Sequence, residues 1–248
     1  MKNLMTIAGA ETRRIFVSPL AWTVLGVTQL IMSIVYVLSL LDFARMAGEG
    51  GDTFGVSDFV GGSLFGFAVI ILLLVMPLMT MRLFSEERKS GSLTLLFSAP
   101  VSLTEIVLGK FLGLLSFVLA MLALLALMPL VLIPATNLDL GRIAAGLLGL
   151  LLLMMAFGAA GLFVSSLTRE PTIAAVGSFG LLLVIWLINM LAYNDSIPFT
   201  ALFSYLSLIG HFESLRRGIF NTADAIYYLL FTGLFLWLTV QRLDMERN

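Results

Sequence analysis

The sequence contains no cysteine and only one histidine, His211. The lack of thiols excludes disulfides and thiolate metal sites, and a single imidazole excludes any site that needs two. Charged residues are also scarce, at 12% of 248 residues, while 60% are hydrophobic. Because a soluble domain carries about 25% charged residues, we expect this chain to fold in a lipid bilayer. The net charge of -1 gives no basic footprint for nucleic acid.

The chain also lacks a phosphate-binding loop. Gly109-Lys110 is followed by Phe111 and has no glycine at the required place upstream, so no Gly-x-x-x-x-Gly-Lys-Ser/Thr motif exists. We therefore expect no nucleotide site and no cofactor on this chain. An intramembrane hydrolase is disfavoured because no serine–histidine pair stands inside an apolar run. Glu86 and Glu87 resemble half of a paired-carboxylate metal site, but no further ligand stands at a helical spacing, so a charged turn is favoured.

Six apolar runs are long enough to cross a bilayer, which takes about 20 residues. They cover residues 20–41, 60–83, 103–133, 140–167, 172–193 and 223–240. The first run lacks a clear small-residue cleavage site, so it is predicted to remain as an anchor. Nothing in the composition marks a second domain. The sequence therefore predicts one all-α membrane domain over residues 1–248.

Residues 1–18 precede the first span and read as an amphipathic helix. Leu4 and Ile7 contribute to an apolar face, and Glu11 and Arg14 belong to the polar face. A helix of this kind lies in the plane of the membrane surface.

The densest cluster of charge lies between the second and third spans, at residues 86–89. Gly91 is predicted to act as a hinge before a short helix, which Pro100 ends because it lacks an amide hydrogen. Ser102 and Glu105 predict a capping box at the start of the next helix. An ordinary charged loop is the alternative. The residues singled out in this region, 85–100, are Glu87, Arg88, Gly91, Leu93, Leu96, Phe97 and Pro100, with Leu93, Leu96 and Phe97 as the apolar face expected to touch a partner.

Basic residues predict the orientation. If the amino terminus lies inside, the inner segments carry Lys2, Arg13, Arg14, Arg82, Arg88, Lys89, Lys110, Arg169, Arg242 and Arg247. The outer segments carry only Arg45, Arg142, Arg216 and Arg217. We therefore expect both termini and the charged cluster to face the cytosol.

The segment 194–222, before the last span, holds an apolar run about half as long as a span. A run this short predicts a re-entrant or interfacial piece on the outer side. The candidate functional residues of this outer segment are His211, Phe212, Glu213 and Arg217.

The spans hold almost no ionisable residue at mid-depth, which disfavours an ion-driven carrier. Gln29, Tyr36 and Asn189 are modest polar residues there; they either bond to neighbouring helices or line a pathway. Small residues recur in the fourth and fifth spans. They let helices approach closely in lipid, either within one chain or at a dimer face.

Three stretches resemble the permeases of ABC-2 type transporters. They are ERKSGSL at 87–93 with Leu96, 98–102 and 105–110; Glu11 with FVSPLA at 16–21; and HFESLRRGI at 211–219. The first looks like the coupling-helix region of that family. The other two look most like the branch that includes the gliding-motility permease GldF. The resemblance spans nearly the whole chain.

The resemblance implies a six-span half-transporter in the bacterial inner membrane, paired with a second copy or a paralogue. Separate ABC ATPase subunits would bind ATP and Mg²⁺, and the chain would export a substrate that these motifs do not identify. The helix at 1–16 would be the interface helix, and the piece around 92–98 the coupling helix. The resemblance leaves open a periplasmic or membrane-anchored accessory partner. The alternative function is a mechanical or regulatory membrane subunit that an ABC ATPase drives without transport.

Overall fold

The computed structural model describes residues 2–48, 55–98, 100–134, 138–192 and 200–247, and all regular structure within these ranges is helical. The helices are α1 (Lys2–Val17), α2 (Pro19–Gly48), α3 (Val56–Thr80), α4 (Arg82–Ser90), α5 (Ser92–Ser98), α6 (Leu103–Leu130), α7 (Leu140–Leu167), α8 (Pro171–Ala192), α9 (Thr200–Leu206), α10 (Leu208–Arg216) and α11 (Thr222–Arg247).

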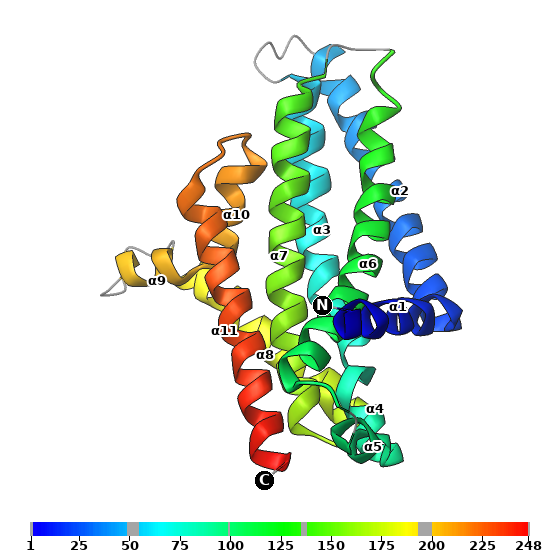
Figure 1. Ribbon diagram of the computed structural model, residues 1–248. Helices are drawn as coiled ribbons and strands as arrows, with labels where there is room; N and C mark the ends of the chain where they lie inside the picture. Colours follow the sequence, from blue (N-terminus) through cyan, green and yellow to red (C-terminus); the bar gives the residue numbers. More distant parts are fainter. Residues whose placement is uncertain (1, 49–54, 99, 135–137, 193–199, 248) are drawn as a thin grey trace.

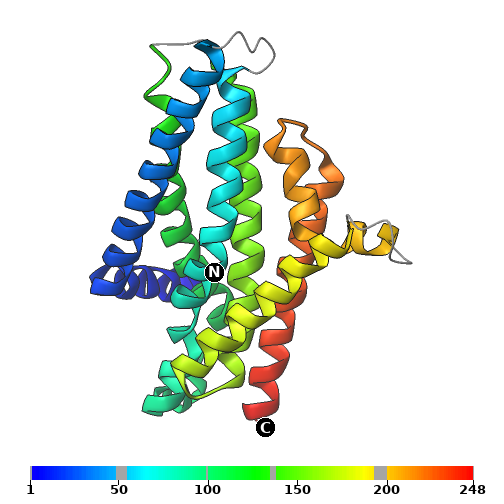
Figure 2. The same cartoon turned by 180° about the vertical axis from the view of Figure 1, so that it is seen from behind.

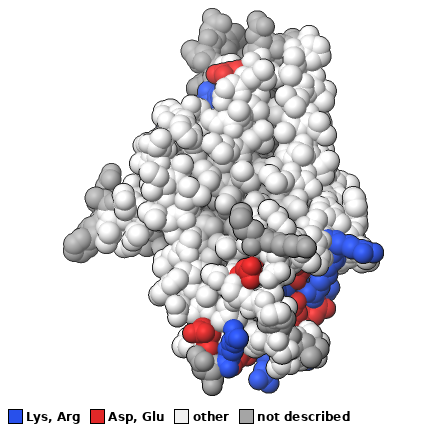
Figure 3. Space-filling view, in the orientation of Figure 1, with Lys and Arg blue, Asp and Glu red and all other residues white. Residues whose placement is uncertain are grey.

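Six segments are long and apolar enough to cross a membrane, which confirms the predicted number. They are Pro19–Met46, Gly61–Ser90, Leu103–Leu130, Leu140–Leu167, Pro171–Ala192 and Thr222–Arg247. Helices α2, α3, α6 and α7 rise side by side, and α1 lies across them near one end (Figure 1). Lys, Arg, Asp and Glu gather at and below the level of α1, and a broad uncharged belt lies above it (Figure 3). We call the end of the bundle that carries α4 and α5 the charged end.

Helix α7 is the centre of the bundle and contacts α3, α6, α8, α10 and α11. Its small residues make this possible. Gly146 lies against Phe65, Gly149 against Phe212, and Gly158 against Leu114. The small residues of the fourth span therefore serve packing within the chain. In the fifth span Ala174 and Ser178 are also buried, whereas a Cβ at Gly180 would meet no atom within 4 Å.

Replacing Gly146 by alanine is expected to lower the unfolding free energy by about 1–3 kcal/mol, the usual cost of overpacking. The added Cβ would overlap the ring of Phe65, which is 1% exposed and has no room to move. The matched control is Gly180→Ala, which should be neutral or stabilising because alanine favours helix. Thermal unfolding in detergent measures both. Equal stability of the two variants would contradict this account of α7.

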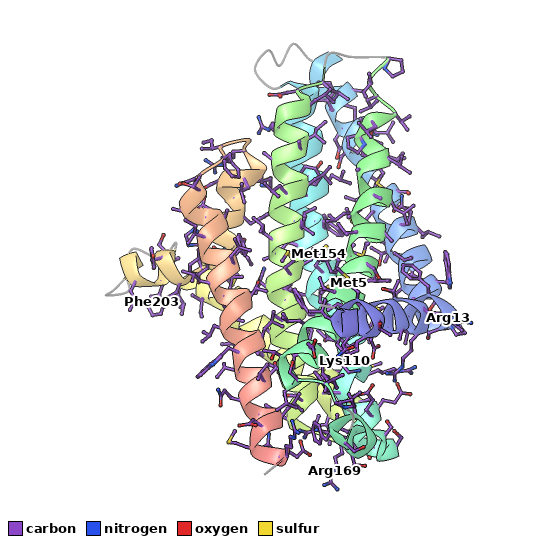
Figure 4. The ribbon with its side chains drawn as sticks, in the orientation of Figure 1. Met5, Arg13, Lys110, Met154, Arg169 and Phe203 are labelled. Atoms are coloured by element: carbon purple, nitrogen blue, oxygen red, sulfur yellow. The ribbon has the colours of Figure 1, made fainter. Side chains whose placement is uncertain are left out.

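Helix α1 packs mainly on α6, and two glycines of α6 allow the two helices to approach closely. A Cβ at Gly109 would lie 2.6 Å from Cγ2 of Ile7, and one at Gly113 would lie 2.5 Å from Cβ of Glu11. Ala8 and Ile15 are buried, while Arg13 is exposed and points outward at the end of α1 (Figure 4). Helix α1 is therefore amphipathic, but Glu11, predicted on its polar face, is buried on the side turned toward α6, where it pairs with Lys110.

The chain between α3 and α6 is divided as local sequence signals predict. Gly91 ends α4 with φ of 73°, a left-handed conformation that favours glycine. The capping box is confirmed: the Ser102 hydroxyl accepts the Glu105 amide at 3.2 Å, and Oε2 of Glu105 accepts the Ser102 amide at 3.1 Å. Pro100 lies between α5 and α6. The predicted amphipathic region thus becomes two helices, α4 and α5, rather than one.

Part of the segment predicted at 194–222 lies closer to the charged end of the bundle than a loop on the outer side would. Residues 194–199 are outside the described part, and the remainder forms α9, α10 and the turn into α11. Helix α8 starts deep in the charged end, so its 22 residues, about 33 Å long, end at mid-height. Helix α9 projects sideways there, at about the height of α1, and α10 climbs from it (Figure 2). Helix α11 then descends to the charged end.

Candidate functional site

Four consecutive charged residues of α4, Glu86 to Lys89, reach four other parts of the chain. Their partners are Arg14 of α1, Lys110 of α6, Glu246 of α11 and Glu170 of the turn between α7 and α8. We call these eight residues together with Glu11 of α1 the charged junction. The sequence predicts a cluster of charge here, but the local pattern could not identify the residues with which these side chains form ion pairs.

Lys110 is the centre of the charged junction. Its ammonium lies 2.5 Å from Oε1 of Glu11 and 2.6 Å from Oε1 of Glu87, and its side chain is only 1% exposed (Figure 4). The ring of Phe84 lies 5.3 Å from the ammonium nitrogen. A buried charge is costly unless it is paired, so Lys110 holds α1, α4 and α6 together through its two carboxylates.

Arg14 extends this cluster to the surface. Its guanidinium donates to Glu86 at 2.9 Å and to Glu87 at 3.3 Å, and Glu11 lies 3.7 Å away. Glu86 and Glu87 are therefore neutralised by cations of the chain itself. Within the described ranges no group of three or more His, Asp and Glu residues is placed to hold a metal ion.

The other two residues of α4 differ in burial. Arg88, with a side chain 4% exposed, pairs with Glu246 of α11. Lys89 pairs with Glu170 at 2.8 Å, and both side chains are about half exposed. Arg88 is thus a structural link between α4 and α11, whereas Lys89 remains accessible at the surface.

Helix α5 turns its apolar face inward. Leu93 is 4% exposed, and Leu96 and Phe97 pack against the hydrophobic core. The outward face consists of exposed polar side chains, chiefly Ser92, Thr94 and Ser98. The apolar residues predicted to touch a partner therefore pack against the rest of the chain. The face of α5 that a partner could contact is polar.

The three polar residues predicted to line a pathway are not brought together. Gln29 donates to the carbonyl of Leu124 at 3.4 Å, and Asn189 accepts from the hydroxyl of Ser207 at 2.7 Å. Tyr36 is half-buried on α2. Helix α2 stands on one side of the bundle, and α8 ends on the other (Figure 2). Within one chain, Gln29 thus bonds to α6 and Asn189 to the N-cap residue of α10, and a role for either in a pathway stays a prediction.

His211 joins α10 to α11 and α9. Its Nδ1 lies 2.6 Å from Oδ1 of Asp224, and its Nε2 lies 3.0 Å from the carbonyl oxygen of Tyr205. The imidazole stacks on Tyr227 with ring centroids 4.3 Å apart. Both ring nitrogens therefore face oxygen acceptors, and the role visible here is to fix the α9–α10–α11 turn.

The remaining candidates of this segment also serve packing. Phe212 is 1% exposed and lies against Gly149 of α7. Glu213 pairs with Arg216 and Arg217, and the hydrogen bond from Arg216 is the main reason that the pKa of this carboxyl lies below its usual range. Arg216 also donates to the carbonyl of Gly62 at 2.6 Å. This end of α10 is thereby tied to α3.

Residue pattern alone missed the role of Lys110, which it counted only as an inner charge within a resembling motif. The available signal was a lone lysine eight residues after Ser102, the predicted N-cap of an apolar helix. A lysine at that depth needs a buried partner. Its partners, Glu11 and Glu87, are 99 and 23 residues away, so no local pattern could name them.

Comparison with protein-family models gives one match, which covers residues 5–240 and is described as an ABC-2 family transporter protein. No curated protein matches the chain. The match includes most of the charged junction and all of α3 to α10. Family membership implies an ABC ATPase partner and a membrane setting. The chain therefore belongs to the ABC-2 family of transporter proteins, as a multi-span permease subunit.

Proposed function

We propose that this chain forms the translocation pathway of an ATP-binding-cassette exporter and is driven by a separate ATPase subunit that docks on α4 and α5. ATP and Mg²⁺ bind to that partner. A second copy or a paralogue completes the pathway, with α1 as the interface helix and α9–α10 as the re-entrant segment. The charged end faces the cytosol of a bacterium, as the distribution of basic residues indicates.

The charged junction is the observation that carries this proposal. A bound partner shifts a conformational equilibrium only through contacts that differ between the two states. Because α4 is paired with α1, α6, α11 and the α7–α8 turn, a push on α4 and α5 would reach each of these elements. A solvated loop would transmit no such displacement.

The docking surface follows from exposure. On α5 and its approach the exposed side chains are small and polar, including Ser90, Ser92 and Thr94, with Lys89 beside them. A groove on the ATPase would therefore admit a narrow polar ridge. The buried Leu93 and the packed Leu96 and Phe97 would keep that ridge rigid.

Thr94→Arg is expected to lower ATP hydrolysis by the reconstituted complex at least tenfold, or to abolish co-purification with the ATPase. The bulky cation would stand on the exposed ridge, while the fold is retained because Thr94 is exposed. The control is Thr222→Arg, also exposed, at the start of α11 away from the charged end. If the Thr94→Arg variant co-purified with the ATPase and supported normal ATP hydrolysis, the assignment of α5 as the docking surface would be wrong.

The same reconstituted complex tests the second candidate function, a mechanical or regulatory subunit. Gln29 and Asn189 are both engaged within the chain, and this observation favours a chain that passes no polar solute. Coupled hydrolysis with no solute moved would support that candidate. Within the family, we propose the gliding-motility branch, with an accessory periplasmic or membrane-anchored partner, on the strength of residues 16–21 and 211–219.

A further inference from the structure

The junction between α3 and α4 is a break in an otherwise continuous helix. Helix α3 ends at Thr80, α4 begins at Arg82, and only Met81 lies between them. The backbone of Met81 is itself helical, with φ of -54° and ψ of -32°. The break therefore consists of changed hydrogen bonds rather than a turn, and a small movement separates it from one unbroken helix.

The hydroxyl of Ser165 on α7 occupies this break. It accepts the amides of Phe84 at 3.1 Å and Ser85 at 3.2 Å, and it donates to the carbonyl of Met81 at 3.0 Å. In an unbroken α-helix the amide of Ser85 would donate directly to that same carbonyl, four residues earlier. One hydroxyl is thus inserted into the hydrogen-bond ladder, and such an insertion is a known cause of helix kinks.

Neighbouring residues favour a bend at the same place. Pro77, one turn before Met81, has no amide hydrogen to donate within α3. The hydroxyl of Thr80 donates to the carbonyl of Met76 at 2.9 Å, and that of Ser85 donates to the carbonyl of Met81. Bonds of this kind, to a carbonyl four residues earlier, often bend helices. The helix is therefore weakened on both sides of the junction.

Close packing of α7 allows the insertion. Gly161 lies one turn before Ser165 on the same face of α7, and a Cβ at Gly161 would overlap the side chain of Thr80. Ser166, next to Ser165 and equally buried, donates instead to the carbonyl of Phe163 in its own helix, at 2.6 Å. Of these two adjacent serines, Ser165 is thus the one whose hydroxyl links α7 to the α3–α4 junction.

We propose that Ser165 is the positioning residue of a hinge between α3 and α4. With its hydroxyl inserted, α4 and α5 are held at the angle seen here. Phe84 and Ser85 are buried, so their amides need another acceptor once the hydroxyl is gone. The nearest is the carbonyl ladder of the helix itself: the amide of Ser85 then bonds Met81 directly, and α4 continues the axis of α3. In one respect this inference rests on the proposed function, because the angle that Ser165 holds is the one at which α5 presents its polar face to the ATPase.

The movement expected at this hinge is large enough to measure. Helix α4 has nine residues, so its far end lies about 13 Å from the junction. Removal of a kink of about 20° then displaces that end by about 4 Å. Helix α5 follows α4 after Gly91 and is displaced with it.

The test uses the full chain in detergent, with spin labels on introduced cysteines, since the chain has none of its own. One label is placed at Ser90, the exposed last residue of α4, and the second at Val27 of α2 or at Ile173 of α8, both exposed. Ser165→Ala should shift at least one of these two distances by about 4 Å. The distance from Val27 to Ile173 does not include α4 and should stay unchanged.

Ser166→Ala is the matched control, because it removes an adjacent buried hydroxyl that bonds only within reach of its own helix turn. It should keep the wild-type distances. Alanine is smaller than serine, so both variants are expected to fold, and thermal unfolding checks this. A purely structural role for Ser165 would lower Tm and leave the distances as they are. Unchanged distances in Ser165→Ala, or an equal shift in Ser166→Ala, would therefore overturn the hinge.

The complex reconstituted with the ATPase tests the positioning role. Ser165→Ala should lower ATP hydrolysis that depends on this chain at least tenfold, while Ser166→Ala should keep it. Normal hydrolysis in a Ser165→Ala chain whose distances have shifted would mean that the ATPase does not respond to this angle, and the positioning role would be wrong. If the wild-type chain itself supported no hydrolysis, the proposed function would fail instead, and the distances in the isolated chain would still decide whether the hinge exists.

Discussion

Lys110→Met is expected to lower the unfolding free energy by about 3–5 kcal/mol, the cost of removing one partner from a buried ion pair. The loss is large because Glu11 and Glu87 would keep only the half-exposed Arg14 as a cation once the buried ammonium between them is removed. Methionine keeps nearly the same length, so the loss reports charge rather than volume. Chemical or thermal unfolding in detergent measures it.

Two controls sharpen this result. Lys89→Met removes an exposed ion pair with Glu170 and should cost at most about 1 kcal/mol. Adding Glu11→Gln and Glu87→Gln to Lys110→Met should recover part of the loss, because the two buried carboxylates that Arg14 alone would otherwise have to offset are then gone. If Lys110→Met were no worse than Lys89→Met, the buried pairing would not exist as described.

Arg88→Glu is expected to destabilise the charged end and to uncouple the complex, with a loss of about 1.5–3 kcal/mol from the buried charged hydrogen bond. Arg88 is 4% exposed and pairs with Glu246, so the variant places two carboxylates together and separates α4 from α11. ATP hydrolysis that depends on this chain should fall at least tenfold, while membrane insertion persists.

The exchange Arg88→Glu with Glu246→Arg provides the matched test. Restoring opposite charges should return most of the lost stability and coupling, since only the polarity of the pair is reversed. A double variant as inactive as Arg88→Glu would mean that Arg88 acts through contacts other than Glu246. Full activity in the single variant would remove α11 from the coupling path.

Local sequence signals predicted much of the fold. The six apolar runs, the capping box at Ser102 and the helix break at Gly91 depend on residues close together in sequence. Helical spacing likewise identified the apolar face of α5. It could not tell whether that face meets the chain itself or a partner, and the structure places Leu93 in the core.

The candidate site was predicted less well because its contacts are non-local. Glu11 and Arg14 belong to one predicted helix and Glu87 to another motif, yet Lys110 pairs with both Glu11 and Glu87. The position of α9 along the bundle could not be predicted either, because it depends on how deep in the charged end α8 begins. Such placements depend on helix packing, which a hydrophobic period does not encode.

The separation of the ion pairs along the chain sets an order of assembly. Lys110 can meet Glu11 and Glu87 once α6 has been synthesised, because all three lie in the first half of the chain. Arg88 must wait for Glu246, 158 residues later. Closing the longer loop also costs more entropy. During biosynthesis α4 is therefore held first by α1 and α6, and its attachment to α11 is the last ion pair of the charged junction to close.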